Sequence, residues 1–217
     1  MEKIKLVELN NSLKPMGKEY YSLIENFISE DFVLTEENLH NFLVQLHNLD
    51  YQNKYEKMFA IKTENSIINE GGTNFVKKEI TVAVNKLLNL DKNASKEIML
   101  AYKLSFLNSY FHEVRHEKQY DICKNEGLNS TALNKVMTYE FLNINQVYNQ
   151  FSAFIEIDAR LNSIERTYDL INKFDALKNP EVSTLILYEV VMLLDGINQI
   201  GIENKPYQAD SFDYEQI

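Results

Sequence analysis

The sequence predicts an α+β fold that is predominantly helical, with a short antiparallel sheet beside one long helix. Long stretches carry apolar residues at helical spacing, and only residues 58–84 alternate as strands do. With 217 residues and 45% hydrophobic positions, the chain can bury one sizeable core. We therefore expect a single domain over residues 1–203 and a C-terminal tail, 204–217, that is either disordered or docked onto the body.

Two helices are expected first, over residues 15–30 and 35–49. The second opens on Thr35, a good N-cap, and has Glu36 and Glu37 in its first turn. Acidic residues are favourable there because the helix dipole places partial positive charge at the N-terminus. We therefore expect two consecutive helices before any strand.

The segment 58–84 is expected to form short strands around a turn. The Gly71-Gly72 pair indicates the turn, and Ile80 and Val82 alternate with polar residues as in a strand with one buried face. This small sheet would come directly before the long helix in the chain.

A helix of about thirty residues is expected next, because no Pro or Gly interrupts it. Asn93 or Ser95 can cap its start, and Gly127 stands where a C-terminal glycine cap belongs. Its apolar residues recur at i+3 and i+4 and form a core-facing stripe. These residues are Leu100, Leu104, Leu107, Phe111 and Val114. His112 and His116 border the stripe and should lie at the edge of the core.

The segment His112-Glu113-Val114-Arg115-His116 is the most informative part of the chain. Imidazoles four residues apart project from one helix face and can bind one metal ion, while the intervening glutamate reaches a water on that metal. With only four histidines in 217 residues, chance is an improbable origin. The alternative is a histidine pair on the solvated face of an amphipathic helix. The pattern favours a zinc hydrolase.

A catalytic zinc site normally has three protein ligands, and no histidine follows His116. Unless a histidine from the N-terminal half folds back, the third ligand is a carboxylate. Our candidate is Glu156, in a helix expected over residues 147–174, because small residues share its face and allow another helix to approach closely. Alternatively, Glu156 forms an ordinary surface ion pair with Arg160, four residues further on.

A last helix is expected to begin at Asn179-Pro180, with Asn179 as N-cap and Pro180 in the first helical position. It should run to Leu194 and is apolar on nearly all sides. This pattern predicts a buried central helix.

The motif His112-Glu113-x-x-His116, followed by Glu156-x-Asp158, resembles the gluzincin class of zinc metallopeptidases, particularly its small intracellular bacterial and phage members, the minigluzincin-like proteins. The resemblance covers two short segments. It implies a zincin-like helical core that hydrolyses peptide bonds in a protein or peptide substrate. It also implies His112, His116 and Glu156 as Zn²⁺ ligands and Glu113 as general base. Strands just before a metal helix can place an edge strand beside the metal, where an extended substrate can pair with it.

The chain departs from the larger gluzincins, which commonly carry an aspartate four residues after the ligand glutamate, because Arg160 stands there. Residues two apart in a helix point to nearly opposite sides, so Glu156 and Asp158 cannot easily bind the same metal. We prefer Glu156, with Asp158 as the fallback ligand. Oxyanion stabilisation falls to Tyr168 or Arg160, since no histidine follows the motif. Gln119 either orients a ligand or is an exposed helical residue.

Two other classes of function remain open. Glu37-x-x-His40 and Glu113-x-x-His116 share the Glu-x-x-His spacing of di-iron or di-manganese carboxylate bundles, with Glu25 as the single glutamate that such a bundle needs before the first pair. That arrangement leaves the first histidine of the motif without a role. The other class is a non-catalytic helical interaction protein with a structural metal or none.

Composition and charge limit which binding partners and which cellular compartment we expect. A net charge of −10 argues against broad contact with nucleic acid or with anionic membranes, because both would be repelled. The single cysteine, Cys123, excludes an internal disulfide framework, and residues 1–13 have no apolar signal region. We therefore expect a cytoplasmic protein without nucleic-acid or membrane partners, and the sequence leaves its oligomeric state open.

Overall fold

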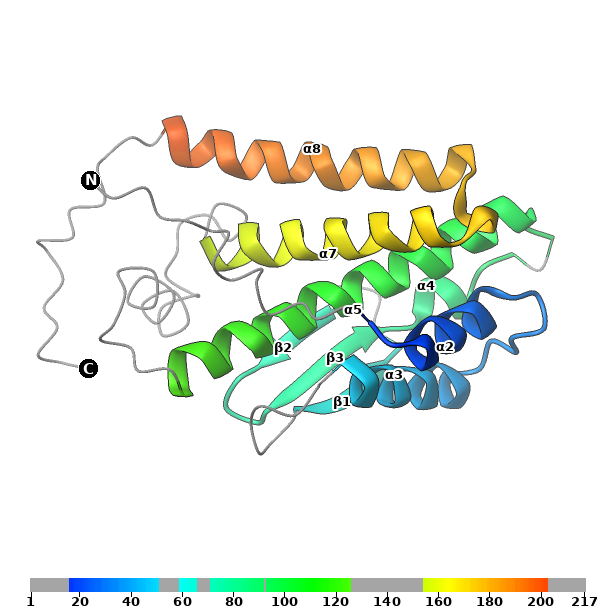
Figure 1. Ribbon diagram of the computed structural model, residues 1–217, viewed down its shortest axis with the longest axis horizontal. Coiled ribbons are helices and arrows are strands. Elements are labelled where there is room, and N and C mark those ends of the chain that lie inside the picture. The colour runs from blue at the N-terminus through cyan, green and yellow to red at the C-terminus, as the bar shows by residue number, and fades with distance from the viewer. Residues whose placement is uncertain (1–15, 51–58, 66–70, 92, 126–153, 203–217) are drawn as a thin grey trace, which may run out of the picture.

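The structure is a computed structural model that describes residues 16–50, 59–65, 71–91, 93–125 and 154–202. Within these ranges helices predominate and one small three-stranded sheet accompanies them, which confirms the α+β, mostly helical fold class (Figure 1). In the same ranges, no helix combines the length and the apolar character that crossing a membrane requires.

The N-terminal helices are α2 (Lys18–Ile28) and α3 (Glu36–Asp50). Thr35 caps α3 as expected, because its Oγ1 accepts a hydrogen bond from the backbone N–H of Asn38 at 3.1 Å. Both helices bury one apolar face in the core, and α3 packs beside strand β1. The two helices therefore cover one side of the core, next to β1.

The sheet consists of β1 (Ala60–Glu64), β2 (Gly71–Asn74) and β3 (Glu79–Ala83), in the order β1-β3-β2. It is mixed and not antiparallel, because β1 runs parallel to β3 while β2 runs antiparallel to it. The Gly71-Gly72 pair is also not a turn, since it begins the edge strand β2. Glycine fits there because another part of the chain approaches the strand closely at Gly71.

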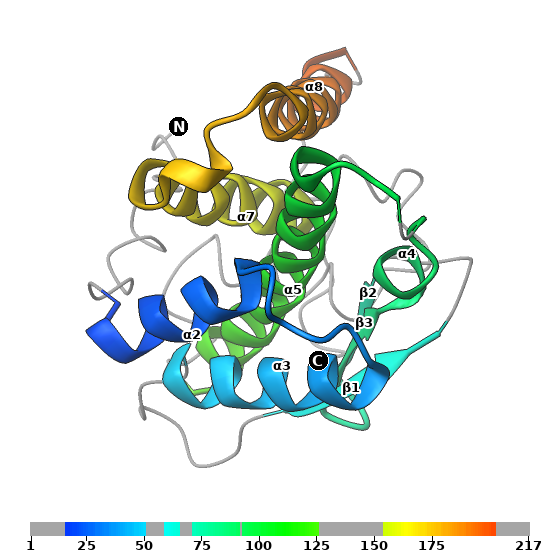
Figure 2. The same ribbon diagram turned by 90° about the vertical axis from the view of Figure 1, so that its right-hand side faces the viewer.

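Helix α5 (Lys96–Asn125) follows the short helix α4 (Asn85–Leu88) and runs through the middle of the fold (Figure 2). Of the two possible caps, Ser95 acts, accepting a hydrogen bond from the N–H of Ile98 at 3.3 Å. One side of α5 packs on the sheet and the other on α7 (Phe154–Lys173). All five residues of the expected core-facing stripe are buried.

Helix α8 (Pro180–Ile202) follows the short 3-10 helix η2 (Asp175–Leu177) and begins as expected, with Asn179 Oδ1 accepting from the N–H of Val182 at 3.0 Å. The expectation that α8 is a buried central helix is wrong, since it forms an outer layer beyond α7. Its outer side exposes large apolar side chains: Leu187, Tyr188, Val191, Leu194 and Ile197. The central place is held by α5, whose polar residues have partners on both sides.

Four predictions fall outside the described residues. They concern the glycine cap at Gly127, the first part of the helix expected over residues 147–174, the tail 204–217 and the side chain of Cys123. From residue 154 onward, the expected helix is present as α7.

Candidate metal centre

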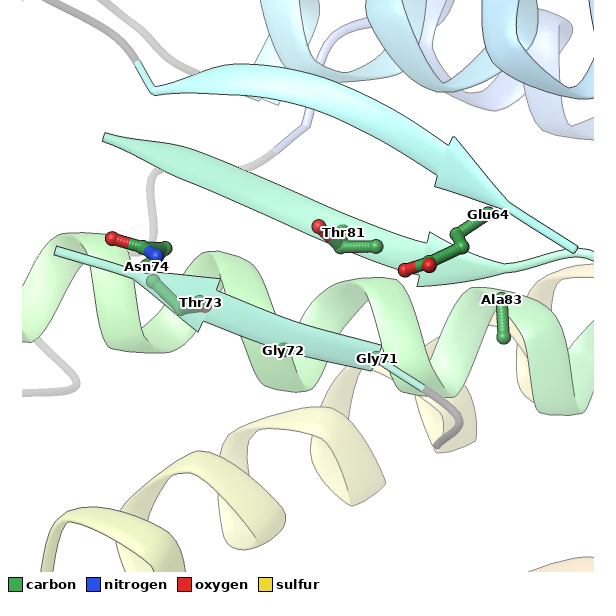
Figure 3. A pocket seen from close by; sticks show the side chains of 7 residues that line it. All are labelled: Glu64, Gly71, Gly72, Thr73, Asn74, Thr81 and Ala83. Atoms are coloured by element: carbon green, nitrogen blue, oxygen red, sulfur yellow. The ribbon is translucent and has the colours of Figure 1, made fainter. Parts of the chain in front are cut away.

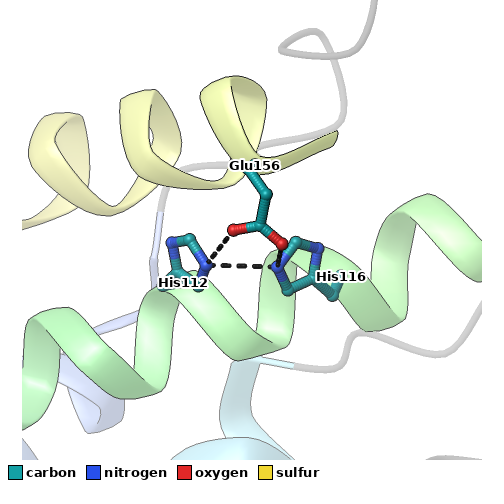
Figure 4. A group of neighbouring side chains, drawn as sticks. All are labelled: His112, His116 and Glu156. Carbon is teal, nitrogen blue, oxygen red and sulfur yellow. Dashed lines mark hydrogen bonds and ion pairs between the residues drawn. The ribbon is translucent and has the colours of Figure 1, made fainter. Parts of the chain in front are cut away.

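Three side chains with ligand atoms converge from two helices. His112 and His116 lie one turn apart on α5, and Glu156 reaches both from α7 (Figure 4). The two Nε2 atoms are 3.1 Å apart, Glu156 Oε2 is 3.1 Å from Nε2 of His112, and Glu156 Oε1 is 3.3 Å from Nε2 of His116. Among the residues that the structure describes, this is the only group of three or more His, Cys, Asp or Glu side chains placed to share a metal ion.

The donor atoms of this group fit zinc. Two ligands bound about 2.0–2.1 Å from a tetrahedral zinc lie about 3.3 Å from each other, which is close to the distance between the two Nε2 atoms and to the distance from each Nε2 to the nearer Glu156 oxygen. Two imidazole nitrogens and a carboxylate oxygen are also a ligand set that catalytic zinc uses. The group therefore has the size and the chemistry of a three-ligand zinc site.

Small residues bring Glu156 close to the histidines. Ala159 and Ser163 follow it on α7, one and two turns later, and both are fully buried. Helices with small side chains at their contact can approach closely, so a glutamate on α7 can reach imidazoles on α5. The alternative of a surface pair between Glu156 and Arg160 is not what the structure has, because Arg160 Nη1 donates to Glu189 Oε2 at 2.7 Å.

Gln119 fixes the orientation of His116. The Gln119 side chain is fully buried, and its Nε2 donates to the backbone oxygen of Ile155 at 2.9 Å and to Oδ2 of Asp158 at 2.7 Å. Its Oε1 therefore faces His116 Nδ1, 2.8 Å away. An amide oxygen only accepts, so Nδ1 of His116 keeps a proton, and Nε2 is the nitrogen that could bind a metal after losing its own. Of the two interpretations of Gln119, this supports ligand orientation.

Asp158, the fallback ligand, faces away from the histidines. Its two carboxylate oxygens accept from Nε and Nη2 of Arg115 at 2.7 and 3.0 Å, in addition to the bond from Gln119. Arg115 is fully buried, and Asp158 is almost so. This bidentate pair joins α5 to α7 within one turn of the three ligands. Asp158 therefore supports the group, and Glu156 supplies the carboxylate.

Glu113 lies on another side of α5, against the edge strand β2. Thr73 Oγ1 donates to Glu113 Oε2 at 2.7 Å, while Glu113 Oε1 has no hydrogen-bond partner in the described part of the chain. At Gly71, an added Cβ would come within 3.0 Å of Glu113 Cγ and 3.1 Å of its Oε1. The strand therefore leaves room for the carboxylate only because residue 71 has no side chain.

The charge states of His116 and Glu156 at the candidate metal centre depend on one another. Burial lowers the pKa of His116, but the carboxylates of Glu156 and Glu113 and the bond to Gln119 together raise it to about 9. Burial likewise opposes ionisation of Glu156, whose pKa is nevertheless lowered by His116 and by hydrogen bonds from both histidines. Glu113 therefore lies within electrostatic reach of the ligand group.

Other residues considered from the sequence lie elsewhere. Tyr168 is exposed and stands about 18 Å along α7 from Glu156, twelve residues at about 1.5 Å each, so the structure does not bring it to the group. His47 is buried on α3 with Glu117, 3.2 Å away. Glu25 and Glu37 are exposed, so they do not join Glu113 in a carboxylate cluster.

Three contributors were not recognised from the sequence, namely Gly71, Thr73 and Arg115. Gly71 and Thr73 alternate along one strand and so share the face toward α5, but the glycine pair resembled a turn. Arg115 stands inside the histidine motif, and no local signal marks an arginine as buried. No protein-family model, curated protein or solved structure matches the chain.

Proposed function

We propose that the protein is a zinc-dependent metallopeptidase of the gluzincin type, with His112, His116 and Glu156 as zinc ligands and Glu113 as general base. The observation that carries the proposal is the convergence of these three side chains: the two Nε2 atoms are 3.1 Å apart, and each lies 3.1–3.3 Å from one oxygen of the Glu156 carboxylate, with a glutamate next to the first histidine. The proposed substrate is a protein or peptide, and the proposed compartment is the cytoplasm.

His112, His116 and Glu156 would hold a zinc ion, which when bound would supply a Lewis acid that lowers the pKa of water toward about 7 and polarises a carbonyl oxygen. Glu113 accepts the proton of the attacking water on Oε1, the oxygen that Thr73 leaves free, and passes it to the leaving amine. Thr73 holds the carboxylate in place during both transfers. Gln119 keeps Nε2 of His116 directed at the metal.

The edge strand β2 supplies a binding surface for an extended substrate. In the sheet order β1-β3-β2, one side of β2 has no strand partner among the described residues, and the peptide is proposed to pair with the backbone groups on that side. The same strand contacts Glu113 through Gly71 and Thr73. A peptide paired with β2 would therefore lie beside the base.

Metal analysis of protein purified without contact with affinity resin tests the metal. We expect about one zinc per chain, bound with better than micromolar affinity in calorimetric titration of the demetallated protein. His112→Ala or His116→Ala should abolish this binding, because two ligands make a poor site. Two irons per chain would support the di-iron alternative, and no metal would support the non-catalytic one.

The substitution Glu113→Gln tests whether Glu113 acts as a general base or as a metal ligand. The variant should retain one zinc and lose hydrolysis of a general protein substrate such as casein, because an amide cannot accept the proton. Loss of zinc together with activity would instead make Glu113 a ligand. Thr73 donates to either side chain, so the fold around β2 should be kept.

A further inference from the structure

A cavity of about 270 Å³ lies on the face of the sheet that points away from α5 (Figure 3). Strand register fixes this face: Gly72 is opposite Thr81, and Glu64 is opposite Ala83, and residues paired across strands share a side. The alternating residues of β3, Ile80 and Val82, are fully buried in the core. Gly72, Thr81, Ala83 and Glu64 therefore form one outward surface that lines the cavity.

Two features of this cavity point to a ligand. Gly72 has no atom within 4 Å of the place where a Cβ would stand, so the edge strand leaves an open passage to Thr81. Glu64 extends from β1 over β3, and its carboxylate has no hydrogen bond or ion pair with any residue that the structure describes. Lys62 is on the same face and exposed, but it does not line the cavity. The cavity is thus bordered by the exposed, unpaired carboxylate of Glu64.

We propose that this cavity binds the side chain of a lysine or arginine in an extended peptide paired with β2, which makes the enzyme selective for basic residues beside the scissile bond. The hydrolytic part of this inference rests on the proposed function, whereas the binding part does not. A cation is favoured because it alone offers the Glu64 carboxylate both an opposite charge and a hydrogen-bond donor.

The strand spacing fits a long side chain. A peptide on the free edge of β2 would lie three interstrand steps, about 14 Å, from β1. Glu64, opposite Ala83, is also two residues along the sheet from Gly72, opposite Thr81, so Glu64 and a peptide residue beside Gly72 lie about 16 Å apart. Glu64 reaches inward from β1 over β3, and only a side chain as long as lysine or arginine, reaching inward over Gly72, brings a charge toward that carboxylate. Shorter side chains would stop at Gly72.

The position of the basic residue along the peptide follows from Gly71, the neighbour of Gly72 in β2. Gly71 contacts Glu113, the proposed base, and Gly72 is the next residue of β2. A side chain that passes over Gly72 therefore belongs to a residue within about two positions of the bond next to Glu113, since strand residues advance about 3.3 Å each.

Binding of peptides to the zinc-loaded Glu113→Gln variant tests the inference without hydrolysis. A displayed library of random peptides should be enriched in Lys or Arg at one position, and replacing that residue by Gln in a selected synthetic peptide should weaken binding about two- to tenfold, as for partly exposed ion pairs. Adding Glu64→Gln should remove the preference, and Glu64→Lys should select Asp or Glu. Glu79→Gln, on the same face but outside the cavity, is the matched control and should change nothing.

Enrichment of another residue class, a basic preference that survives both Glu64 variants, or no selected peptide would each overturn the proposal. Hydrolysis by the wild-type protein is measured separately on the selected peptides. A protein that binds basic peptides but cleaves none contradicts the peptidase function and leaves the binding site standing. A protein that cleaves peptides without a preference for basic residues contradicts the proposed binding site and leaves the peptidase function standing.

Discussion

Glu156 and Asp158 lie two residues apart on α7 and have different partners. Glu156 faces the two imidazoles, whereas Asp158 faces Arg115 and Gln119. In a helix their directions differ by about 200°, so substitutions at the two positions should have different effects on a metal. The distinction can be measured without a substrate.

We expect Glu156→Ala to reduce zinc affinity far more than Asp158→Asn. The first removes a ligand, while the second disturbs the support of His116 and should cost about ten- to hundredfold. Competition with a chromogenic chelator measures both. Equal losses would contradict the assignment of Glu156 as ligand and Asp158 as support.

Gln119→Leu should also weaken zinc binding by about ten- to hundredfold, although Gln119 is not a ligand. Leucine fills a similar volume but cannot accept the Nδ1 proton of His116, so the ring loses its fixed tautomer. The ¹⁵N spectrum of the zinc-bound protein reports that tautomer directly. A purely structural role would lower the stability of the metal-free protein and leave the affinity unchanged.

At the level of elements, β2 contacts Glu113, the proposed base, and lines the cavity proposed to bind a substrate side chain. Its Thr73 hydroxyl donates to the Glu113 carboxylate, and its Gly71 leaves that carboxylate room. An edge strand only four residues long thus contacts both the base and the cavity next to it. Two pairs of variants separate these contributions.

Thr73→Val should lower kcat about tenfold or more while zinc content stays at one per chain, because a positioned base contributes about 10²–10⁴-fold and loses its orientation. Thr73→Ser should restore most of the rate, since it keeps the hydroxyl. If valine and serine variants behave alike, the hydroxyl does not position Glu113.

Gly71→Ala and Gly72→Ala should have opposite effects on stability. A Cβ at residue 71 would crowd Glu113 and the Thr81 backbone oxygen, 3.1 Å away, and such overpacking typically costs about 1–3 kcal/mol. A Cβ at residue 72 meets nothing, so alanine there should stabilise by about 0.4–1 kcal/mol through the unfolded chain. Urea denaturation of the metal-free proteins measures both. Equal stabilities would contradict the close approach at Gly71.

Local sequence patterns explain which elements were predicted correctly, and contacts between distant segments explain which features were not predicted. Caps at Thr35, Ser95 and Asn179 and the apolar spacing of α5 act within a few residues, so the sequence alone located three helices. The spacing of His112 and His116 is likewise local, and the approach of Glu156 to them was expected from the small residues on its helix face. The parallel pairing of β1 with β3 and the burial of Arg115 depend on contacts between distant segments, which periodicity does not encode.

Across the whole molecule, a buried charged network holds the helices around the centre. Asp50 of α3 accepts from Arg166 of α7 at 2.7 Å and from Lys118 of α5 at 3.3 Å, and Arg166 donates to the hydroxyl of Tyr20 on α2 at 2.7 Å. The guanidinium also lies 4.1 Å from the ring centre of Phe111. Three helices therefore meet at one carboxylate within one turn of His116 along α5, and α2 joins them through Arg166.

Removing the Asp50 carboxylate should lower the free energy of unfolding strongly. Asp50→Asn leaves Arg166 buried without its charge partner, and breaking a buried pair in this way typically costs about 3–5 kcal/mol. The surface aspartate Asp175, paired with Lys178 in solvent, is the matched control, and Asp175→Asn should leave the stability nearly unchanged. Denaturation at pH 7 compares the two. Similar losses would mean that the network contributes no more than a surface pair.

The same network predicts how stability depends on pH. Burial alone raises the pKa of Asp50, but Arg166 and Lys118 lower it to about 2, below its ordinary value of 3.8. A group with a lowered folded pKa stabilises above its unfolded pKa, so this contribution, about 2 kcal/mol, is complete above about pH 4 and is lost as the pH falls toward 2. Glu156 has a lowered pKa as well, so acid destabilises the wild type at more than one site. The difference in unfolding free energy between wild type and Asp50→Asn isolates Asp50. Measured on metal-free protein from pH 5 to 2, that difference should shrink, and a constant difference would show that Asp50 does not ionise differently on folding.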